Sequence, residues 1–188
     1  MYKKKILIAS VLIIVAIVAF NIMGNKKVSE NTKVALETTQ GTIVIELYTG
    51  QMPITASNFV KLVNEKFYDG VIFHRVIDGF MIQGGDPTGT GAGGPGYKIK
   101  DEFTGSDLDK NLRGTVSMAN AGPNTGGSQF FLNLLDNNFL DGKHPVFGRV
   151  VEGMDVVDKI AQVKTDGDPP IGNNRPLKED KIISARVV

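Results

Sequence analysis

The stretch Phe73–Asp86, with the sequence FHRVIDGFMIQGGD, decides how we expect the surrounding chain to fold. It contains two short runs, residues 71–76 and 80–84, and each has a length typical of a strand. Asp78-Gly79 lies between them, and an Asp-Gly pair between apolar runs is a strong hairpin signal. The stretch therefore predicts two antiparallel strands joined by a tight turn.

Alternation along these strands brings one positive charge next to apolar and amide side chains. Successive strand residues point to opposite faces, so Phe73 and Arg75 would share one face of the first strand. On the second strand, the same alternation separates Met81 and Gln83 from Phe80 and Ile82. The arrangement predicts a site built around Arg75, and the alternative is a surface arginine whose aliphatic stem covers the strand pair.

Further strands and two helices are predicted on either side of this stretch. Residues 33–39 and 42–48 alternate and are joined by Gln40-Gly41, which indicates a hairpin. Apolar residues at helical spacing predict helices over 53–64, where a proline suits the first turn, and over 154–161. The remaining strands are predicted at residues 113–120, 128–134, 145–150 and 181–188.

The strand at 128–134 indicates which fold class these elements make. One of its faces, with Phe130, Leu132 and Leu134, is wholly apolar, whereas the other carries two amide side chains beside Phe131. A small closed barrel needs such an apolar interior and can have a mixed exterior. The sequence therefore predicts a mainly β fold, an antiparallel barrel with only two helices.

A glycine-rich loop, residues 86–96, follows the opening stretch. It contains the spacing G-x-G-x-x-G at Gly89, Gly91 and Gly94, which is typical of dinucleotide-binding turns. That role requires a helix directly after the glycines, with its amino end facing the pyrophosphate. Pro95-Gly96 follows here without any helical period, so the pattern favours flexible backbone near the site over a nucleotide site.

The amino end differs from the rest of the chain. Three lysines, Lys3–Lys5, precede an apolar run from Ile6 to Met23, which is at the short end of what crosses a bilayer. No clear cleavage site follows this run. We therefore expect an uncleaved signal-anchor at 1–27, a linker at 28–32 and one extracytoplasmic domain at 33–188. The alternative is a cleaved signal peptide, which would give a secreted or periplasmic protein.

Composition excludes several classes of site in this domain. The chain has no cysteine and only two histidines, so neither a thiol nucleophile nor a zinc site is expected. Beyond residue 27, 16 lysines and arginines stand against 20 acidic residues, which gives a net charge of −4 without any basic run. Nucleic acid is therefore not an expected partner. No metal or cofactor is predicted, and we expect a monomer.

The residues of the opening stretch suit a reaction that breaks no covalent bond. Rotation about a prolyl peptide bond has a barrier of about 18–20 kcal/mol because amide resonance is lost in the twisted state. An apolar pocket can hold the proline ring, while the permanent charge of Arg75 stabilises the twisted amide more than the planar one. His74, which would face away from Arg75, is expected to be a hydrogen-bonded packing residue.

Four separated motifs make the sequence similar to the cyclophilin family of peptidyl-prolyl isomerases. They are FHRVIDGFMIQGGD at Phe73–Asp86, GTVSMANA at Gly114–Ala121, GSQFF at Gly127–Phe131 and LDGKHPVF at Leu140–Phe147. The resemblance covers residues 33–188 and implies a closed eight-stranded antiparallel β-barrel capped by two α-helices, here preceded by the N-terminal hydrophobic helix. Together with the predicted anchor, it implies a cofactor-independent prolyl isomerase that assists the folding of exported proteins.

The resemblance also implies roles for individual residues. Arg75 would be the catalytic arginine, and Gln83 would orient it and touch the substrate backbone. The proline pocket would be lined by Phe80, Met81, Phe131, Leu140 and His144, with Phe131 at its floor. The peptide groove would be flanked by Ala119, Asn120 and Gln129. Two alternatives are a proline-binding chaperone module without turnover and a purely structural role for the anchored domain.

One position departs from the family pattern. The best-known cyclophilins have a tryptophan immediately before the Leu-Asp-Gly of the last motif, whereas this chain has Phe139. That tryptophan contributes to the binding of cyclosporin-type macrocycles. Because Phe139 is expected at the rim of the pocket, we expect catalysis to persist and cyclosporin to bind only weakly.

Overall fold

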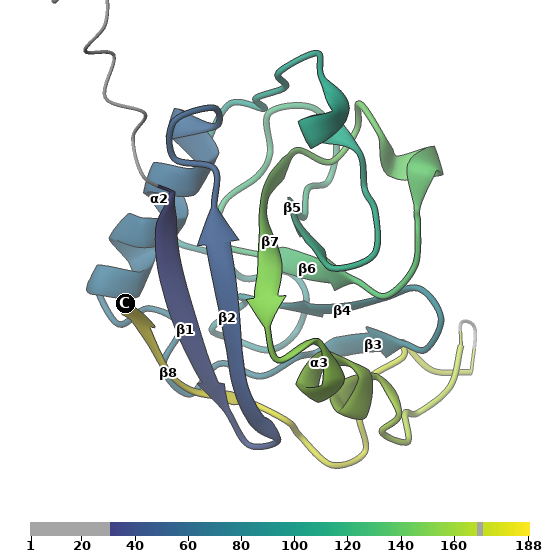
Figure 1. The fold of residues 1–188 in the computed structure, drawn as a ribbon. Helices are drawn as coiled ribbons and strands as arrows, with labels where there is room; N and C mark the ends of the chain where they lie inside the picture. The colour runs from purple at the N-terminus through teal and green to yellow at the C-terminus, as the bar shows by residue number, and fades with distance from the viewer. Residues whose placement is uncertain (1–30, 169–170) are drawn as a thin grey trace, which may run out of the picture.

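The computed structural model describes residues 31–168 and 171–188, which form one antiparallel sheet with two α-helices packed against it (Figure 1). The helices are α2 (Pro53–Asn64) and α3 (Met154–Ala161). The strands are β1 (Thr32–Thr38), β2 (Gly41–Leu47), β3 (Arg75–Ile77), β4 (Met81–Gly84), β5 (Thr115–Met118), β6 (Phe130–Asn133), β7 (Val146–Glu152) and β8 (Ile182–Val187). Two short 3₁₀ helices lie in the connections, η1 (Asp107–Asp109) and η2 (Asn138–Leu140). The predicted mainly β class with two helices is confirmed.

All eight strands belong to one sheet, in the order β3-β4-β6-β5-β7-β2-β1-β8. Every neighbouring pair is antiparallel, and β1 and β2 form the predicted hairpin. Beside the two end strands, the Phe73 N–H donates to the Asp180 carbonyl and the Ile182 N–H to the Val71 carbonyl, both at 2.9 Å. The described residues contain no ladder between β3 and β8, so full closure of the barrel stays a prediction.

Apolar side chains of the sheet and of α2 form the core. Phe59 of α2 is fully buried and packs on three aromatic rings. The ring centroids lie 4.8 Å away for Tyr68, 5.2 Å for Phe130 and 5.4 Å for Phe147. Because β6 and β7 carry two of these rings, α2 connects parts of the chain that are distant in sequence. The second helix, α3, contacts β2, β3 and β4 through a buried apolar side.

The first strand of the opening stretch is shorter than predicted. β3 begins only at Arg75, and the residues before it contribute one isolated bridge, between Ile72 and Lys181. Because residues 72–74 leave the ladder, strand alternation does not hold there. Phe73 is fully buried in the core, whereas Arg75 lines a cavity. The prediction that these two side chains share a face was wrong.

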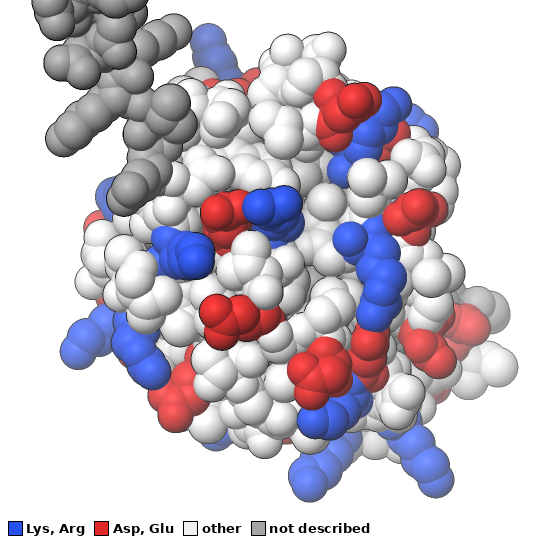
Figure 2. Space-filling model, in the orientation of Figure 1, with Lys and Arg blue, Asp and Glu red and all other residues white. Residues whose placement is uncertain are grey.

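The predicted anchor at residues 1–27 lies outside the described residues. Within 31–168 and 171–188, no helix has both the length and the apolar character needed to cross a membrane. On the face of the molecule shown in Figure 2, acidic and basic side chains are interspersed without a large area of one sign. This face agrees with the lack of basic runs in the sequence.

Candidate active site

A cavity of about 620 Å³ lies on the part of the sheet where β3, β4 and β6 are neighbours. Most of the residues predicted from the sequence line it: Arg75, Phe80, Met81, Gln83, Ala119, Asn120, Phe131, Leu140 and His144. Gln129 lines an adjoining cavity of about 550 Å³, which shares Gln83, Ala119 and Asn120 with the first. Of the predicted site residues, only Phe139 lines neither cavity.

The strand register explains why Arg75, Gln83 and Phe131 lie side by side. Arg75 on β3 is paired with Gln83 on β4, and Gln83 is paired with Phe131 on β6. Directly paired residues of antiparallel strands share a face, with Cβ atoms about 4.5–5.5 Å apart. The next row of paired residues is buried in the core: Val76, Ile82 and Leu132. A slip of one residue in this register would exchange the cavity row with the core row.

The Arg75 guanidinium is half-buried and has no hydrogen bond or ion pair with any residue in the described ranges. Its N–H donors are therefore available to a bound molecule. In the adjoining cavity, Gln129 Nε2 donates to the carbonyls of Gly91 and Gly93, both at 2.9 Å. Because carbonyls only accept, Gln129 must turn its Oε1 toward Gln83, whose Nε2 donates to it at 2.9 Å. The Gln83 amide thus has one fixed orientation.

The other end of the cavity is apolar. Met81 and Phe131 are 1% and 4% exposed, and the His144 ring stands edge-on to Phe131 with 5.4 Å between centroids. The Nδ1 atom of His144 lies 3.1 Å from the Met118 carbonyl. Since that carbonyl can only accept, Nδ1 carries a hydrogen, and Nε2 of the neutral ring is an acceptor. This end forms a recess suited to a small apolar ring.

Phe139 lies at the rim of the cavity. It is 63% exposed and stacks on Phe80, with 5.7 Å between ring centroids and 26° between ring planes. Phe80 itself lines the cavity next to Met81, although strand alternation predicted opposite faces for these two residues. That prediction was wrong because Phe80 belongs to the turn before β4, where alternation does not apply.

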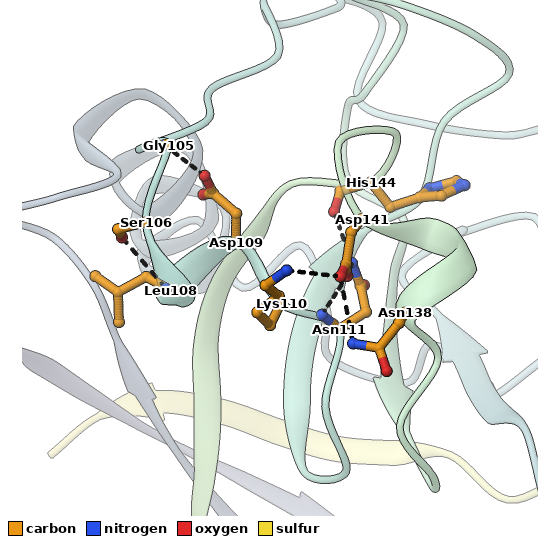
Figure 3. Close-up of polar contacts among 9 residues, drawn as sticks. All are labelled: Gly105, Ser106, Leu108, Asp109, Lys110, Asn111, Asn138, Asp141 and His144. Carbon is orange, nitrogen blue, oxygen red and sulfur yellow. Dashed lines mark hydrogen bonds and ion pairs between the residues drawn. The ribbon is translucent and has the colours of Figure 1, made fainter.

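A buried asparagine holds the segment that carries Leu140 and His144 (Figure 3). The backbone N–H of Asn111 donates to Asp141 Oδ1 at 2.8 Å, and its Nδ2 donates to the His144 carbonyl at 3.4 Å. Asn138 Nδ2 donates to the other oxygen of Asp141 at 3.3 Å. Burial alone would raise the pKa of the Asp141 carboxyl, but the hydrogen bonds from Asn111 and Asn138 and the charge of Lys110 together outweigh it and lower that pKa. The carboxylate is therefore ionised and fixes the loop.

His74 differs from its predicted role. Its ring is buried and lines the cavity, yet neither ring nitrogen has a hydrogen-bond partner among the described residues. Burial lowers the pKa of His74, Asp86 opposes this shift, and Arg175 and Arg75 reinforce it. The prediction of a hydrogen-bonded packing residue was wrong, because residues 72–74 leave the ladder and the ring turns toward the cavity instead. A lowered pKa keeps this imidazole neutral near pH 7.

Sequence reasoning missed one wall of the cavity. Asn173–Arg175, from the connection before β8, line it together with Gly89–Gly91. The Arg175 guanidinium donates to the carbonyl of Gly89 and pairs with Glu179 at 3.1 Å. A long irregular connection has no periodicity from which such a contact could be predicted.

Comparison with known proteins points to one family. Residues 33–187 match the family model of the cyclophilin type peptidyl-prolyl cis-trans isomerases. Peptidyl-prolyl cis-trans isomerase-like 1 of Gibberella zeae is 50% identical over 160 residues, which cover 84% of this chain and 95% of that protein. Peptidyl-prolyl cis-trans isomerase ppi1 of Schizosaccharomyces pombe is 52% identical over 155 residues, covering 81% of this chain and 96% of that protein.

A solved structure shows the same fold. The crystal structure of a cyclophilin type peptidyl-prolyl cis-trans isomerase from Cryptosporidium parvum aligns with a TM-score of 0.77 and 34% sequence identity. The alignment covers 84% of this chain and 98% of that one. On these grounds, the chain belongs to the family of cyclophilin-type peptidyl-prolyl cis-trans isomerases.

Proposed function

We propose that the cavity of about 620 Å³ is where this isomerase rotates Xaa-Pro peptide bonds, with Arg75 as the catalytic residue. The observation that supports this most strongly is a guanidinium without a partner among the described residues, next to an apolar recess. The Cryptosporidium parvum isomerase has also been crystallised in the presence of the dipeptide Ala-Pro. A proline-containing peptide is accordingly the substrate class that we assign to this cavity.

The proline ring would occupy the apolar end of the cavity. The side chains around it would be Phe80, Met81, Phe131, Leu140 and His144, with Phe131 as the floor. The peptide backbone would run past Ala119, Asn120 and Gln129. Burial of apolar surface contributes about 25 cal/mol per Å² to binding. This contribution is nearly equal for the planar and the twisted amide, so it sets affinity more than rate.

Arg75 would supply the rate acceleration. As the amide twists, resonance is lost and the prolyl nitrogen gains a lone pair that accepts a hydrogen bond. The guanidinium can donate to that nitrogen or to the carbonyl, and either interaction is stronger in the twisted state. Gln83, which is paired with Arg75 across the strands and fixed by Gln129, would orient the guanidinium and contact the peptide backbone. No proton transfer or covalent intermediate is needed.

The variant Arg75→Ala tests this assignment. We expect kcat/KM for cis-to-trans relaxation of an Xaa-Pro peptide to fall about a hundredfold, as is typical when one transition-state donor is removed. Uncatalysed relaxation takes tens to hundreds of seconds, so even a small residual activity is measurable. The matched control is Arg149→Ala, which removes an exposed arginine paired with Glu46 and should leave activity unchanged. Full activity in a folded Arg75→Ala variant would refute the assignment.

We also propose that the enzyme acts on exported proteins from a membrane anchor. The support comes from the sequence, in which Lys3–Lys5 precede the apolar run from Ile6 to Met23. The full chain should stay in the membrane pellet after an alkaline wash, whereas a chain that lacks residues 1–27 should be recovered in the supernatant. Release of the full chain by the wash would contradict the anchor but not the exported clients, because a cleaved signal peptide would also give an extracytoplasmic enzyme.

A further inference from the structure

Asp86, two residues after β4, has a buried carboxylate that accepts hydrogen bonds from several backbone N–H groups of the glycine-rich loop. Its side chain is fully buried. Oδ1 accepts from the N–H and the hydroxyl of Thr88, both at 2.8 Å. Oδ2 accepts from the N–H groups of Gly91 at 2.7 Å, Gly93 at 3.0 Å and Thr90 at 3.1 Å. All these donors belong to one short segment, residues 88–93, which therefore takes its shape from Asp86.

The Asp86 carboxylate is ionised near pH 7. Burial alone would raise the pKa of Asp86, but hydrogen bonds from Thr88, Gly93 and Gly91 outweigh it and lower that pKa to about 2. A buried charge is tolerated only when several donors satisfy it. Glycine at position 93 permits this packing, because a Cβ there would collide with the carboxylate. The close approach of the Asp86 carboxylate to the loop backbone thus depends on glycine at position 93.

The loop held by Asp86 in turn holds the amides next to Arg75. The carbonyls of Gly91 and Gly93, whose N–H groups bind Asp86, are the acceptors for Gln129 Nε2. Gln129 Oε1 accepts from Gln83, and Gln83 is paired with Arg75 across β3 and β4. An unbroken sequence of hydrogen bonds therefore runs from the buried carboxylate to the residue beside the guanidinium.

We infer that Asp86 is a positioning residue for catalysis: it fixes the glycine carbonyls that orient Gln129 and, through it, Gln83. The inference rests on the proposed role of Gln83 and Arg75 in the cavity. Asp86 itself is fully buried and lines neither of the two cavities, so we assign it no contact with the substrate. Its effect on the reaction must then depend on Gln129, and this dependence separates positioning from a general contribution to stability.

The test is a double-mutant cycle on kcat/KM in the full chain. Asp86→Asn removes the charge and places an NH₂ group against N–H donors, so we expect kcat/KM to fall about tenfold. In the Gln129→Leu background, which already lacks the amide, the same substitution should lower kcat/KM by less than about twofold, because the effects of coupled sites are not additive. The loss should be in kcat more than in KM. The side-chain amide resonances of Gln129 should also shift in Asp86→Asn.

Asp109→Asn is the matched control. The Asp109 carboxylate likewise accepts from backbone N–H groups of a loop, that of Gly105 at 2.6 Å (Figure 3) and that of Thr104 at 2.9 Å. It has no hydrogen bond to Gln129. This variant should keep kcat/KM and the Gln129 resonances of the wild type. If it lowers kcat/KM as much as Asp86→Asn does, the effect is one of loop stability and the inference fails.

Two further outcomes, both measured on Asp86→Asn, would overturn the positioning role. One is full activity in folded Asp86→Asn, and the other is an equal loss with and without the Gln129 amide. Should Asp86→Asn not fold, Thr88→Val is the substitute, because it removes one hydroxyl donor to the carboxylate. Its decrease in kcat/KM should be smaller, and it must likewise disappear in the Gln129→Leu background. Arg75→Ala on the same peptide tests the catalytic assignment separately, so a failure of the proposed function is distinguishable from a failure of this inference.

Discussion

A single buried imidazole links the stability of this protein to pH. His74 has no hydrogen-bond partner in the described ranges, and burial lowers its pKa below the usual value of about 6.5. In the unfolded chain the ring is free to bind a proton, so the unfolded state holds more protons in the window just below that value. The free energy of unfolding therefore rises with pH across this window and falls on acidification.

His74→Gln isolates this effect, because His144 and all carboxylates remain. We expect the wild type to lose more melting temperature than the variant when the pH is lowered from about 7.5 to about 5, a range that spans the unperturbed imidazole pKa. Thermal unfolding followed by circular dichroism measures both proteins under identical conditions. Equal losses in the two proteins would mean that the ring titrates alike in the folded and unfolded states.

Phe139 allows a prediction about inhibitors. Its ring is 63% exposed and stacks on Phe80 at the rim, where an indole would add both apolar area and an N–H donor. We expect weak inhibition of the wild type by cyclosporin and at least about tenfold tighter inhibition of Phe139→Trp, which corresponds to about 1.4 kcal/mol. Titration of the drug against isomerase activity measures both. Nanomolar inhibition of the wild type would contradict the prediction.

Residues in regular strands could be predicted from the sequence, and their neighbours outside the ladder could not. Met81, Gln83 and Phe131 reach the cavity because they alternate with core residues along β4 and β6. Phe73 and His74 lie where the chain leaves the ladder, so a rule of period two assigns them the wrong surroundings. Strand alternation therefore predicts the faces of residues in β4 and β6 correctly, but not those of the residues immediately before Arg75.

Among the connecting elements, the segment from η2 to β7 depends most on one side chain. The Asn111 side chain is fully buried, and its Nδ2 donates to Asp141 Oδ1 at 3.2 Å and to the His144 carbonyl at 3.4 Å, so it fixes the wall of the apolar recess (Figure 3). Asn111→Ala should raise KM about fivefold, which corresponds to the free energy of about one hydrogen bond. The change in kcat should be smaller, because the catalytic Arg75 lies on β3 and not on this segment. Line-shape analysis of a proline peptide by NMR separates the two constants.

Asn138→Ala provides the graded comparison for that variant. Asn138 is exposed and its side chain contributes only one hydrogen bond to Asp141, at 3.3 Å, so removal of that side chain should raise KM less than removal of the Asn111 side chain. Unchanged KM in folded Asn111→Ala would show that the segment keeps its position without this network. A larger increase in KM in Asn138→Ala than in Asn111→Ala would contradict the prediction that the Asn111 contacts matter more.

The helices were predictable as elements, whereas the shapes of the loops were not. The predicted spans 53–64 and 154–161 agree with α2 and α3, since a continuous apolar period and a proline at the first turn are local signals. Residues 86–96 were correctly predicted as a loop without a helix after it. Its shape depends on a carboxylate that accepts from backbone N–H groups, and no pattern of side chains records such contacts.

For the whole molecule, the two ends of the described chain meet in the sheet. β1 and β8 are neighbours, with Leu36 opposite Ala185. Ile182, at the start of β8, is fully buried, and the burial of such a side chain contributes about 1.5–3 kcal/mol. That is a large share of the about 5–15 kcal/mol by which domains are stable. We therefore expect β8 to be essential for the fold although it contributes no residue to the cavity.

We accordingly expect opposite consequences from two truncations. The core begins at Val34, and every residue that lines the proposed active site lies between His74 and Arg175. A chain without residues 1–30 should keep its melting temperature and kcat/KM, whereas one without residues 182–188 should lose both cooperative unfolding and activity. Calorimetry and the peptide assay on the two proteins test this. Activity in the chain without β8 would show that the site assembles independently of the sheet's far end, and a loss in the chain without residues 1–30 would place part of the domain's stability before β1.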